Sequence, residues 1–215
     1  MKVVEIFESI DGEGIFAGYP ATFIRLYGCN LNCSYCDSRY ACEGNVYQNL
    51  TASAIVEMAK GFGHKHITLT GGEPLIHNNV LSLIKKLQRA GFVVNIETDG
   101  AVDIVPFVNR RSIFTLDYKC PSSGMENRMI LSNLKALREK DVLKFVVGTQ
   151  EDLQKAKEII EEYHLQGYCN IFISPVFGKI EPKEIVEFLL ENHLDEVRVQ
   201  LQIHKFIWDP NMKGV

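Results

Sequence analysis

The feature that most constrains this sequence is a short loop that contains Cys29, Cys33 and Cys36 at spacings of four and three residues. Half of the six cysteines of the chain lie in this loop. Small and polar residues separate the thiols, so the loop can wrap one soft metal centre without regular backbone hydrogen bonding. An iron–sulfur cluster normally takes four thiolates and a structural zinc takes four ligands. Three cysteines therefore leave one coordination position for a ligand that is not protein.

Two other interpretations of the cysteines stay open from spacing alone. Cys42 follows Cys36 by six residues and could complete a four-cysteine zinc site. A buried thiol with no chemical role is also common.

Composition and length favour one soluble domain, residues 1–215. The chain is 46% hydrophobic and 23% charged, which is ordinary for a domain with a large core. The net charge of −4 disfavours a general nucleic-acid or membrane surface. The first residues lack the apolar core of a signal peptide, and no apolar run approaches the ~20 residues that span a bilayer. We expect a cytoplasmic protein, in which clustered cysteines bind metal rather than form disulfides.

Extended and helical patterns alternate along most of the chain, which is typical of a parallel sheet covered by crossover helices. Strands are expected at residues 3–7, 20–27, 66–70, 92–97, 113–117, 142–147, 170–174 and 196–200. Helices are expected at residues 51–60, 80–90, 130–138, 152–163 and 182–192. A complete eightfold barrel takes ~250 residues. The pattern therefore predicts an α/β fold that is a partial, open (β/α) barrel, with reacting groups at the carboxyl ends of its strands.

A second motif, Thr70-Gly71-Gly72-Glu73-Pro74, directly follows an expected strand. Two adjacent glycines let backbone groups approach a ligand without a side-chain clash, and the ring of Pro74 fixes the turn. Together with the cysteine loop, in which Tyr35 precedes the last cysteine, this motif resembles the radical S-adenosylmethionine (SAM) enzymes. The resemblance implies that the three cysteines hold a 4Fe-4S cluster and that SAM chelates the fourth iron. An electron from the cluster would then cleave SAM to methionine and a 5'-deoxyadenosyl radical.

A narrower resemblance, to the 7-carboxy-7-deazaguanine synthase family of 7-deazapurine and queuosine biosynthesis, covers nearly the whole chain. The matching segments are residues 10–14, 25, 28–31, 35–38, 70–74, 97–100, 117–119, 174–176 and 202–210. It implies a lyase that contracts 6-carboxy-5,6,7,8-tetrahydropterin to 7-carboxy-7-deazaguanine with loss of ammonia, after a hydrogen atom is taken from C6. It also implies a homodimer, a magnesium ion (Mg²⁺) and an electron donor such as a flavodoxin, with no nucleic-acid or membrane partner.

The same resemblance assigns site residues. Substrate contacts are expected at Ile10, Asp11, Gly12, Glu13, Arg25, Thr70, Glu97, His204 and Pro210. SAM contacts are expected at Tyr35, Cys36, Asp37, Gly72, Asp117, Tyr118, Lys119, Ser174, Pro175, Val176 and Phe177. The metal ligands would be Cys29, Cys33 and Cys36 for the cluster and Ser38 for magnesium. The planar guanidinium of Arg25 suits the substrate carboxylate.

The chain departs from the family pattern at two places. Asp11 stands where the family usually has glutamine, which reverses the donor and acceptor balance of an amide. Asp117-Tyr118-Lys119 stands where the family usually has serine-proline-lysine. Cys42, Cys120 and Cys169 match no family ligand.

Two other functions remain as alternatives. One is a radical SAM activase that takes hydrogen from a glycine of a partner protein, although an activase has no need for Arg25, Glu97 and the His204 segment together. The other is a non-catalytic zinc-binding module, which iron and sulfide analysis would distinguish.

The spacing predicts that Cys29, Cys33 and Cys36 are each essential for the cluster, whereas Cys42, Cys120 and Cys169 are not. Cys33→Ala should therefore lose the bound iron and Cys42→Ala should keep it, as measured by iron and sulfide analysis after anaerobic purification. If Cys42→Ala lost iron as completely as Cys33→Ala, the site would have four protein ligands and no open position.

Overall fold

A computed structural model describes residues 1–210 and 212–215, and the strands found there form one nine-stranded sheet. In sheet order they are β3 (Gln48–Asn49), β1 (Lys2–Ile10), β2 (Pro20–Leu26), β4 (His66–Gly71), β5 (Val93–Thr98), β6 (Ile113–Tyr118), β7 (Val142–Val147), β8 (Asn170–Pro175) and β9 (Val197–Val199). Every neighbouring pair from β2 to β9 is parallel. The carboxyl ends of these strands therefore meet at one edge of the sheet.

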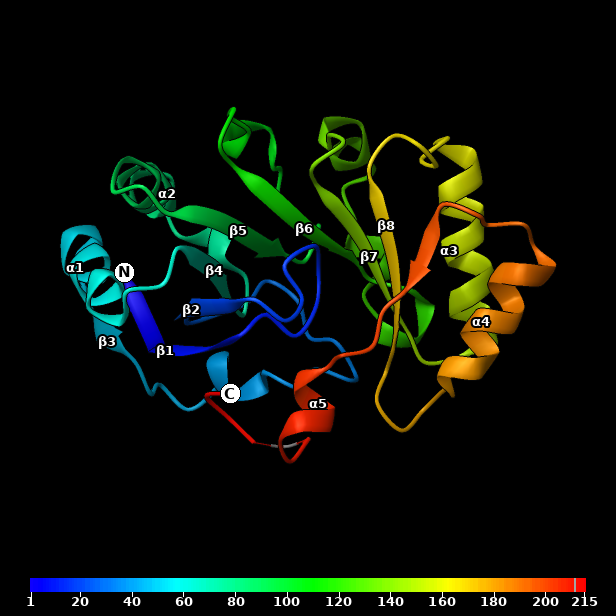
Figure 1. Cartoon of the computed structure of the whole chain (residues 1–215), viewed down its shortest axis with the longest axis horizontal. Coiled ribbons are helices and arrows are strands. Elements are labelled where there is room, and N and C mark those ends of the chain that lie inside the picture. Colours follow the sequence, from blue (N-terminus) through cyan, green and yellow to red (C-terminus); the bar gives the residue numbers. More distant parts are fainter. Residues whose placement is uncertain (211) are drawn as a thin grey trace.

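Helices cover the outside of the curved sheet (Figure 1). They are α1 (Ala52–Phe62), α2 (Val80–Arg89), α3 (Gln150–Glu162) and α4 (Pro182–Glu191), whereas the short α5 (His204–Ile207) does not cover this face (Figure 1). Figure 1 shows α1 and α2 beside one part of the arc and α3 and α4 beside the other, while α5 and the C-terminus lie across the open side. The expected partial, open (β/α) barrel is confirmed. Among the described helices, none is both long and apolar enough to cross a membrane.

Local signals explain where the helices begin. The Thr51 side chain accepts a hydrogen bond from the backbone of Ala54 at the start of α1. A capping box formed by Thr149 and Asp152 starts α3 at Gln150, two residues before the expected position. These caps satisfy amide groups that have no partner inside the helix.

The parallel strands have an apolar outer face and a polar inner face. Leu69, Ile96 and Phe145 belong to the hydrophobic core that packs under the helices. Thr68 and Asn95 are paired neighbours in β4 and β5 and are buried on the other face. Because side chains alternate along a strand, the same alternation aims polar groups at the strand ends into the barrel.

The structure corrects three expectations about elements. The first strand runs to Ile10 rather than ending at residue 7, and it pairs antiparallel with β2 instead of joining the parallel part. Residues 130–138 form no α-helix but a 3-10 helix, Leu131–Ala136. The cause is Asn133, whose buried amide donates to the Gly100 and Val102 carbonyls and accepts from Ile104, so its side chain ties this segment to a distant loop. The two-residue β3 was not expected.

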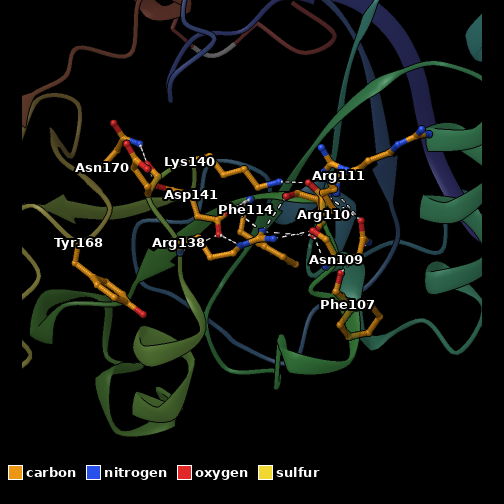
Figure 2. Close-up of polar contacts among 12 residues, drawn as sticks. Phe107, Asn109, Arg110, Arg111, Phe114, Arg138, Lys140, Asp141, Tyr168 and Asn170 are labelled. Atoms are coloured by element: carbon orange, nitrogen blue, oxygen red, sulfur yellow. Dashed lines mark hydrogen bonds and ion pairs between the residues drawn. The ribbon is translucent and has the colours of Figure 1, made fainter.

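A polar network closes the amino ends of β6 and β7, away from the carboxyl edge (Figure 2). The fully buried Asp141 accepts from the Phe114 backbone at 2.9 Å and from Arg138 Nε at 2.6 Å. Arg138 also donates to the carbonyls of Asn109 and Ser112 at 2.7 and 2.8 Å. Asp141 thereby joins the starts of two neighbouring strands.

Asp141→Ala should destabilise the fold by about 2–4 kcal/mol, because it leaves a partly buried guanidinium and a strand amide without their acceptor. The free energy of unfolding, measured anaerobically in denaturant, checks this. Glu139→Ala changes an exposed neighbour and should cost less than about 0.5 kcal/mol. Equal costs for the two variants would contradict the role given to Asp141.

Candidate functional site

A pocket of about 280 Å³ opens at the carboxyl edge of the sheet. Its walls come from the cysteine loop and from the ends of β4, β5, β6 and β7, where Thr70, Glu97, Asp117 and Val146 lie. The segment after β8 contributes Val176 and Phe177 to the lining, and α5 contributes His204. Binding sites of open α/β sheets lie in this position, outside the carboxyl ends of the strands.

Cys29, Cys33 and Cys36 all line this pocket. The loop between them is held by a hydrogen bond from the Ser34 backbone to Ser123 at 3.0 Å and by Arg39, which donates to the Cys33 carbonyl at 2.9 Å. No three His, Cys, Asp or Glu side chains of the described residues gather around one point as ligands of a single ion would. Each cysteine of a 4Fe-4S cluster binds a different iron, so three cysteines that line one pocket fit that group.

The other three cysteines occupy different surroundings. Cys120 and Cys169 are buried in the hydrophobic core and lie outside the pocket lining. Cys42 does line the pocket, and its hydrogen bond with Cys29 is the largest cause that raises the pKa of the Cys29 thiol, with burial adding to it. The Gly28 amide donates to the Ala41 carbonyl at 2.8 Å and brings these two cysteines together.

Both glycines of the Thr70–Pro74 motif are required by close packing. A Cβ atom on Gly71 would lie 2.3 Å from the Leu26 carbonyl oxygen, and one on Gly72 would lie 2.2 Å from that of Gly28. The turn therefore packs its backbone directly against the start of the cysteine loop, with room only for glycine.

Glu73 of the same motif faces away from the pocket. Its fully buried carboxyl accepts from the Leu75 amide at 2.8 Å and from the Asp99 amide at 2.6 Å. Burial and the neighbouring Asp99 carboxyl raise the pKa of Glu73 well above its ordinary value. Glu73 thus ties the ends of β4 and β5 together, and Asp99 in turn lies 3.7 Å from the Cys29 sulfur.

The expected substrate side of the pocket contains Ile10, Gly12, Glu13, Arg25, Thr70, Glu97 and His204. Arg25 Nε pairs with Glu5 at 2.7 Å, so the Nη groups can donate to a ligand. Burial raises the pKa of Glu97, while Lys144 and a hydrogen bond from Thr70 oppose that shift. A cation and hydrogen-bonding carboxyls in one cavity suit a ligand with a carboxylate and several N–H groups.

His204 reaches the pocket from the C-terminal segment. The Ile203 amide donates to the Gly12 carbonyl at 3.1 Å, and a Cβ on Gly12 would lie 1.9 Å from His204 Nδ1. Gly12 is therefore the position that admits the imidazole. Burial lowers the pKa of His204.

Four charged side chains form a row across the pocket wall. Lys119 Nζ lies 3.0 Å from Asp117 Oδ2, Lys144 Nζ lies 3.4 Å from the same oxygen, and Lys144 Nζ lies 2.7 Å from Glu13 Oε2. Sequence reasoning missed Lys144, although one lysine in the otherwise apolar strand Val142–Val147 was a usable signal.

On the expected SAM side, Tyr35, Cys36, Asp37, Gly72, Asp117, Lys119, Val176 and Phe177 line the pocket. Ser38 also lines it, and its hydroxyl donates to Asp37 Oδ1 at 3.0 Å. Asp37 Oδ2 accepts from Lys205 at 3.1 Å. The lining also includes residues to which the sequence assigned no site role, among them Asn32, Arg39, Thr98, Asp99, Gln202 and Lys205.

Five expected site residues do not line the pocket: Asp11, Tyr118, Ser174, Pro175 and Pro210. The Asp11 side chain is buried, and its carboxyl accepts from the Thr68 hydroxyl at 2.6 Å. Tyr118 faces the core, where its ring packs 5.4 Å from that of Phe145. Ser174 is fully buried in β8, and Pro210 is exposed. Alternation along β6 accounts for Tyr118, and the turn of the first loop accounts for Asp11.

Comparison with known proteins gives a consistent set of relatives. Residues 23–106, which include both motifs, match the family described as the Radical SAM superfamily. The chain is 49% identical to 7-carboxy-7-deazaguanine synthase from Clostridium acetobutylicum, over 100% of this chain and 99% of that protein. It is 43% identical to the protein of the same name from Methanospirillum hungatei, over 98% and 86%. The solved structure of QueE from Escherichia coli superposes with a TM-score of 0.76 at 23% identity, over 93% of this chain and 92% of that one.

The surroundings of Asp11 predict a pH-dependent stability. Burial raises the pKa of this carboxyl to about 7, against the Thr68 hydrogen bond, and Glu97 adds to the rise. A carboxyl whose pKa is higher in the folded than in the unfolded state stabilises the fold fully at pH values below its unfolded-state pKa. This contribution is lost as the pH rises through the folded-state pKa of about 7. Between pH 5 and 8 the parent should lose about 2–3 kcal/mol relative to Asp11→Asn, whose amide does not titrate.

Anaerobic denaturant unfolding of both proteins at pH 5 and pH 8 measures this difference. Parallel changes in the free energy of unfolding for the parent and for Asp11→Asn would show that Asp11 is ionised in the fold throughout this range.

Proposed function

Because the chain belongs to the 7-carboxy-7-deazaguanine synthase family of radical SAM enzymes, we propose that it contracts 6-carboxy-5,6,7,8-tetrahydropterin to 7-carboxy-7-deazaguanine with loss of ammonia. One observation carries the proposal. A single pocket is lined by the three cysteines, the Gly71-Gly72 turn, Arg25, Glu97 and His204. A radical SAM activase would have no need for this second set of charged groups beside the cysteines.

The radical SAM domain implies a 4Fe-4S cluster and SAM. Cys29, Cys33 and Cys36 would hold the cluster. When bound, the cluster and SAM supply a radical that removes a hydrogen atom from the substrate. The backbone at Gly72 lies against Cys29, because a Cβ there would be 2.8 Å from the Cys29 Cβ atom. Gly72 can therefore present its backbone groups to a ligand held next to that cysteine.

The chain's own residues bind and orient the substrate. Arg25 would donate to its carboxylate, in a wall that Phe7 and Tyr40 shield, since both rings lie within 6 Å of the guanidinium carbon. Glu13 and Glu97 would accept from the N–H groups of the pterin ring. Because these groups are buried and fixed by neighbours, they need little reorganisation when the substrate binds.

A magnesium ion is a further part of the proposal. Ser38 lies two residues after Cys36, so the loop that fixes the cluster also fixes the Ser38 hydroxyl in the pocket wall. Magnesium prefers hard oxygen ligands and keeps several waters. The hydroxyl of Ser38 and the substrate carboxylate would supply two of those oxygens, and the ion would offset charge that Arg25 alone does not neutralise.

The remaining partners are proposed on the family pattern. They are a second copy of the chain in a homodimer and an electron donor such as a flavodoxin, in the cytoplasm. Cys36 is exposed, which places the cysteine loop within reach of an external donor. One radical SAM domain spanning residues 1–215 agrees with the single sheet.

Anaerobic incubation of the cluster-loaded protein with SAM, dithionite, magnesium and 6-carboxytetrahydropterin tests the function directly. Mass spectrometry should detect 7-carboxy-7-deazaguanine. Unchanged pterin alongside cleavage of SAM would reject this substrate while keeping the radical SAM assignment.

Arg25→Ala should weaken pterin binding by about 2–5 kcal/mol, because it leaves the substrate carboxylate buried without a cation. Iron content and SAM affinity should stay at parental values. Glu5→Gln is the matched control, since it removes the Arg25 ion-pair partner and keeps the guanidinium. Loss of soluble protein in Arg25→Ala would instead indicate that Arg25 supports the fold.

Ser38→Ala should leave the cluster and SAM binding intact and remove most of the rate gain that follows addition of magnesium. The measurement is the rate of product formation as magnesium is titrated into each protein. Ser34→Ala is a control within the same loop, because the Ser34 hydroxyl donates to the Ser122 carbonyl instead of lining the pocket. An unchanged magnesium titration in Ser38→Ala would reject the assignment.

A further inference from the structure

Lys144 is a buried cation that the proposed function has not used. It lies in the middle of β7, a strand whose six residues are all buried, and its side chain is 9% exposed. Its Nζ atom contacts Glu13 Oε2 at 2.7 Å and Asp117 Oδ2 at 3.4 Å. Glu13 belongs to the expected substrate side of the pocket and Asp117 to the expected SAM side. One ammonium group therefore joins the two halves of the site.

The charge on Lys144 is permanent at physiological pH. Burial alone would lower its pKa, but Glu13, Asp117 and Glu97 together raise the pKa well above its ordinary value. A buried ammonium that lost these carboxylates would be strongly unfavourable, so its position and theirs are fixed together.

Each of the two carboxylates uses one oxygen on Lys144 and leaves the other without a partner. Glu13 Oε1 and Asp117 Oδ1 are buried and accept no hydrogen bond from any residue that the structure describes. Both residues line the pocket. Buried acceptors without donors are unfavourable, so these oxygens are suited to donors from a ligand. Pterin N–H groups can supply one donor, and the ribose hydroxyls of SAM can supply the other.

We propose that Lys144 is a positioning residue that couples the binding of the pterin to the binding of SAM. The inference rests on the proposed function, because it needs a pterin on the Glu13 side. A ligand that fixes either carboxylate also fixes Lys144 and, through it, the opposite carboxylate. The second ligand then meets an acceptor that is already ordered, so each ligand tightens the binding of the other.

The test uses anaerobic, cluster-loaded protein without a reductant, so that both ligands bind and neither reacts. Equilibrium dialysis measures the affinity for SAM with and without saturating 6-carboxytetrahydropterin, and then the affinity for the pterin with and without SAM. In the parent protein each ligand should tighten the other by about 5- to 50-fold. Both directions must give the same factor, because coupling between binding sites is reciprocal.

Lys144→Met keeps an unbranched side chain of similar length and removes the charge, and it should reduce the coupling factor to below about twofold. Lys144→Arg keeps a cation and should restore part of it. Lys183→Met removes a lysine that is exposed on α4 and should leave the factor unchanged. A purely structural role for Lys144 would instead lower the affinity for both ligands and leave the coupling factor as in the parent.

Asp117→Ser provides a second test that keeps Lys144. It cuts the SAM-side contact, leaves the Glu13–Lys144 pair in place and should also abolish the coupling, so it decides the question if Lys144→Met fails to fold. Parental coupling in either folded variant overturns the inference. A parent that binds both ligands independently overturns it as well and leaves the proposed function intact, whereas a parent that binds no pterin overturns both.

Discussion

The structure depends on keeping ionised side chains buried at the carboxyl edge of one parallel sheet. The outer face of that sheet is apolar and lies under helices, so the inner face must hold whatever polar groups the chemistry needs. Lys144 and Lys119 are paired there with Asp117 and Glu13. Such pairs add little net stability in themselves, because the free energy needed to remove the charges from water is about as large as the free energy of their attraction. Their arrangement is better explained by ligands than by folding.

The backbone around the cysteines is fixed by packing rather than by metal alone. Gly72 sits against Gly28, and the buried Glu73 carboxyl ties its own turn to the amide of Asp99. Glu73 therefore helps to fix the position of the cysteine loop from outside the pocket. A rigid support of this kind holds the ligands of a site close to productive geometry.

Much of this organisation could be predicted from the sequence. The cysteine spacing, the Gly71-Gly72 turn and the alternation of elements give the barrel and the edge at which its pocket lies. Most site residues carried over from the family pattern do line that pocket. These signals are local, since spacing within a loop and position at a strand end require no knowledge of distant contacts.

The remainder depends on contacts between distant segments. Asp11 lies between two residues that line the pocket, and only the fold shows that its side chain turns to Thr68. The pairing of Arg25 with Glu5 follows from the antiparallel register of β1 and β2, which the helix and strand pattern did not predict. The Asn133 side chain likewise donates to the Gly100 and Val102 carbonyls of a distant loop, and its own segment forms a 3-10 helix instead of the expected α-helix.

In the proposed mode of binding, the buried charges of the pocket recognise the charge of the substrate. Isothermal titration of anaerobic, cluster-loaded protein can compare 6-carboxytetrahydropterin with the tetrahydropterin that lacks the carboxylate. Because a hydrogen bond to a charged group contributes about 1.5–3 kcal/mol, the carboxylated ligand should bind about 10- to 150-fold more tightly. Equal affinities for the two ligands would contradict this account.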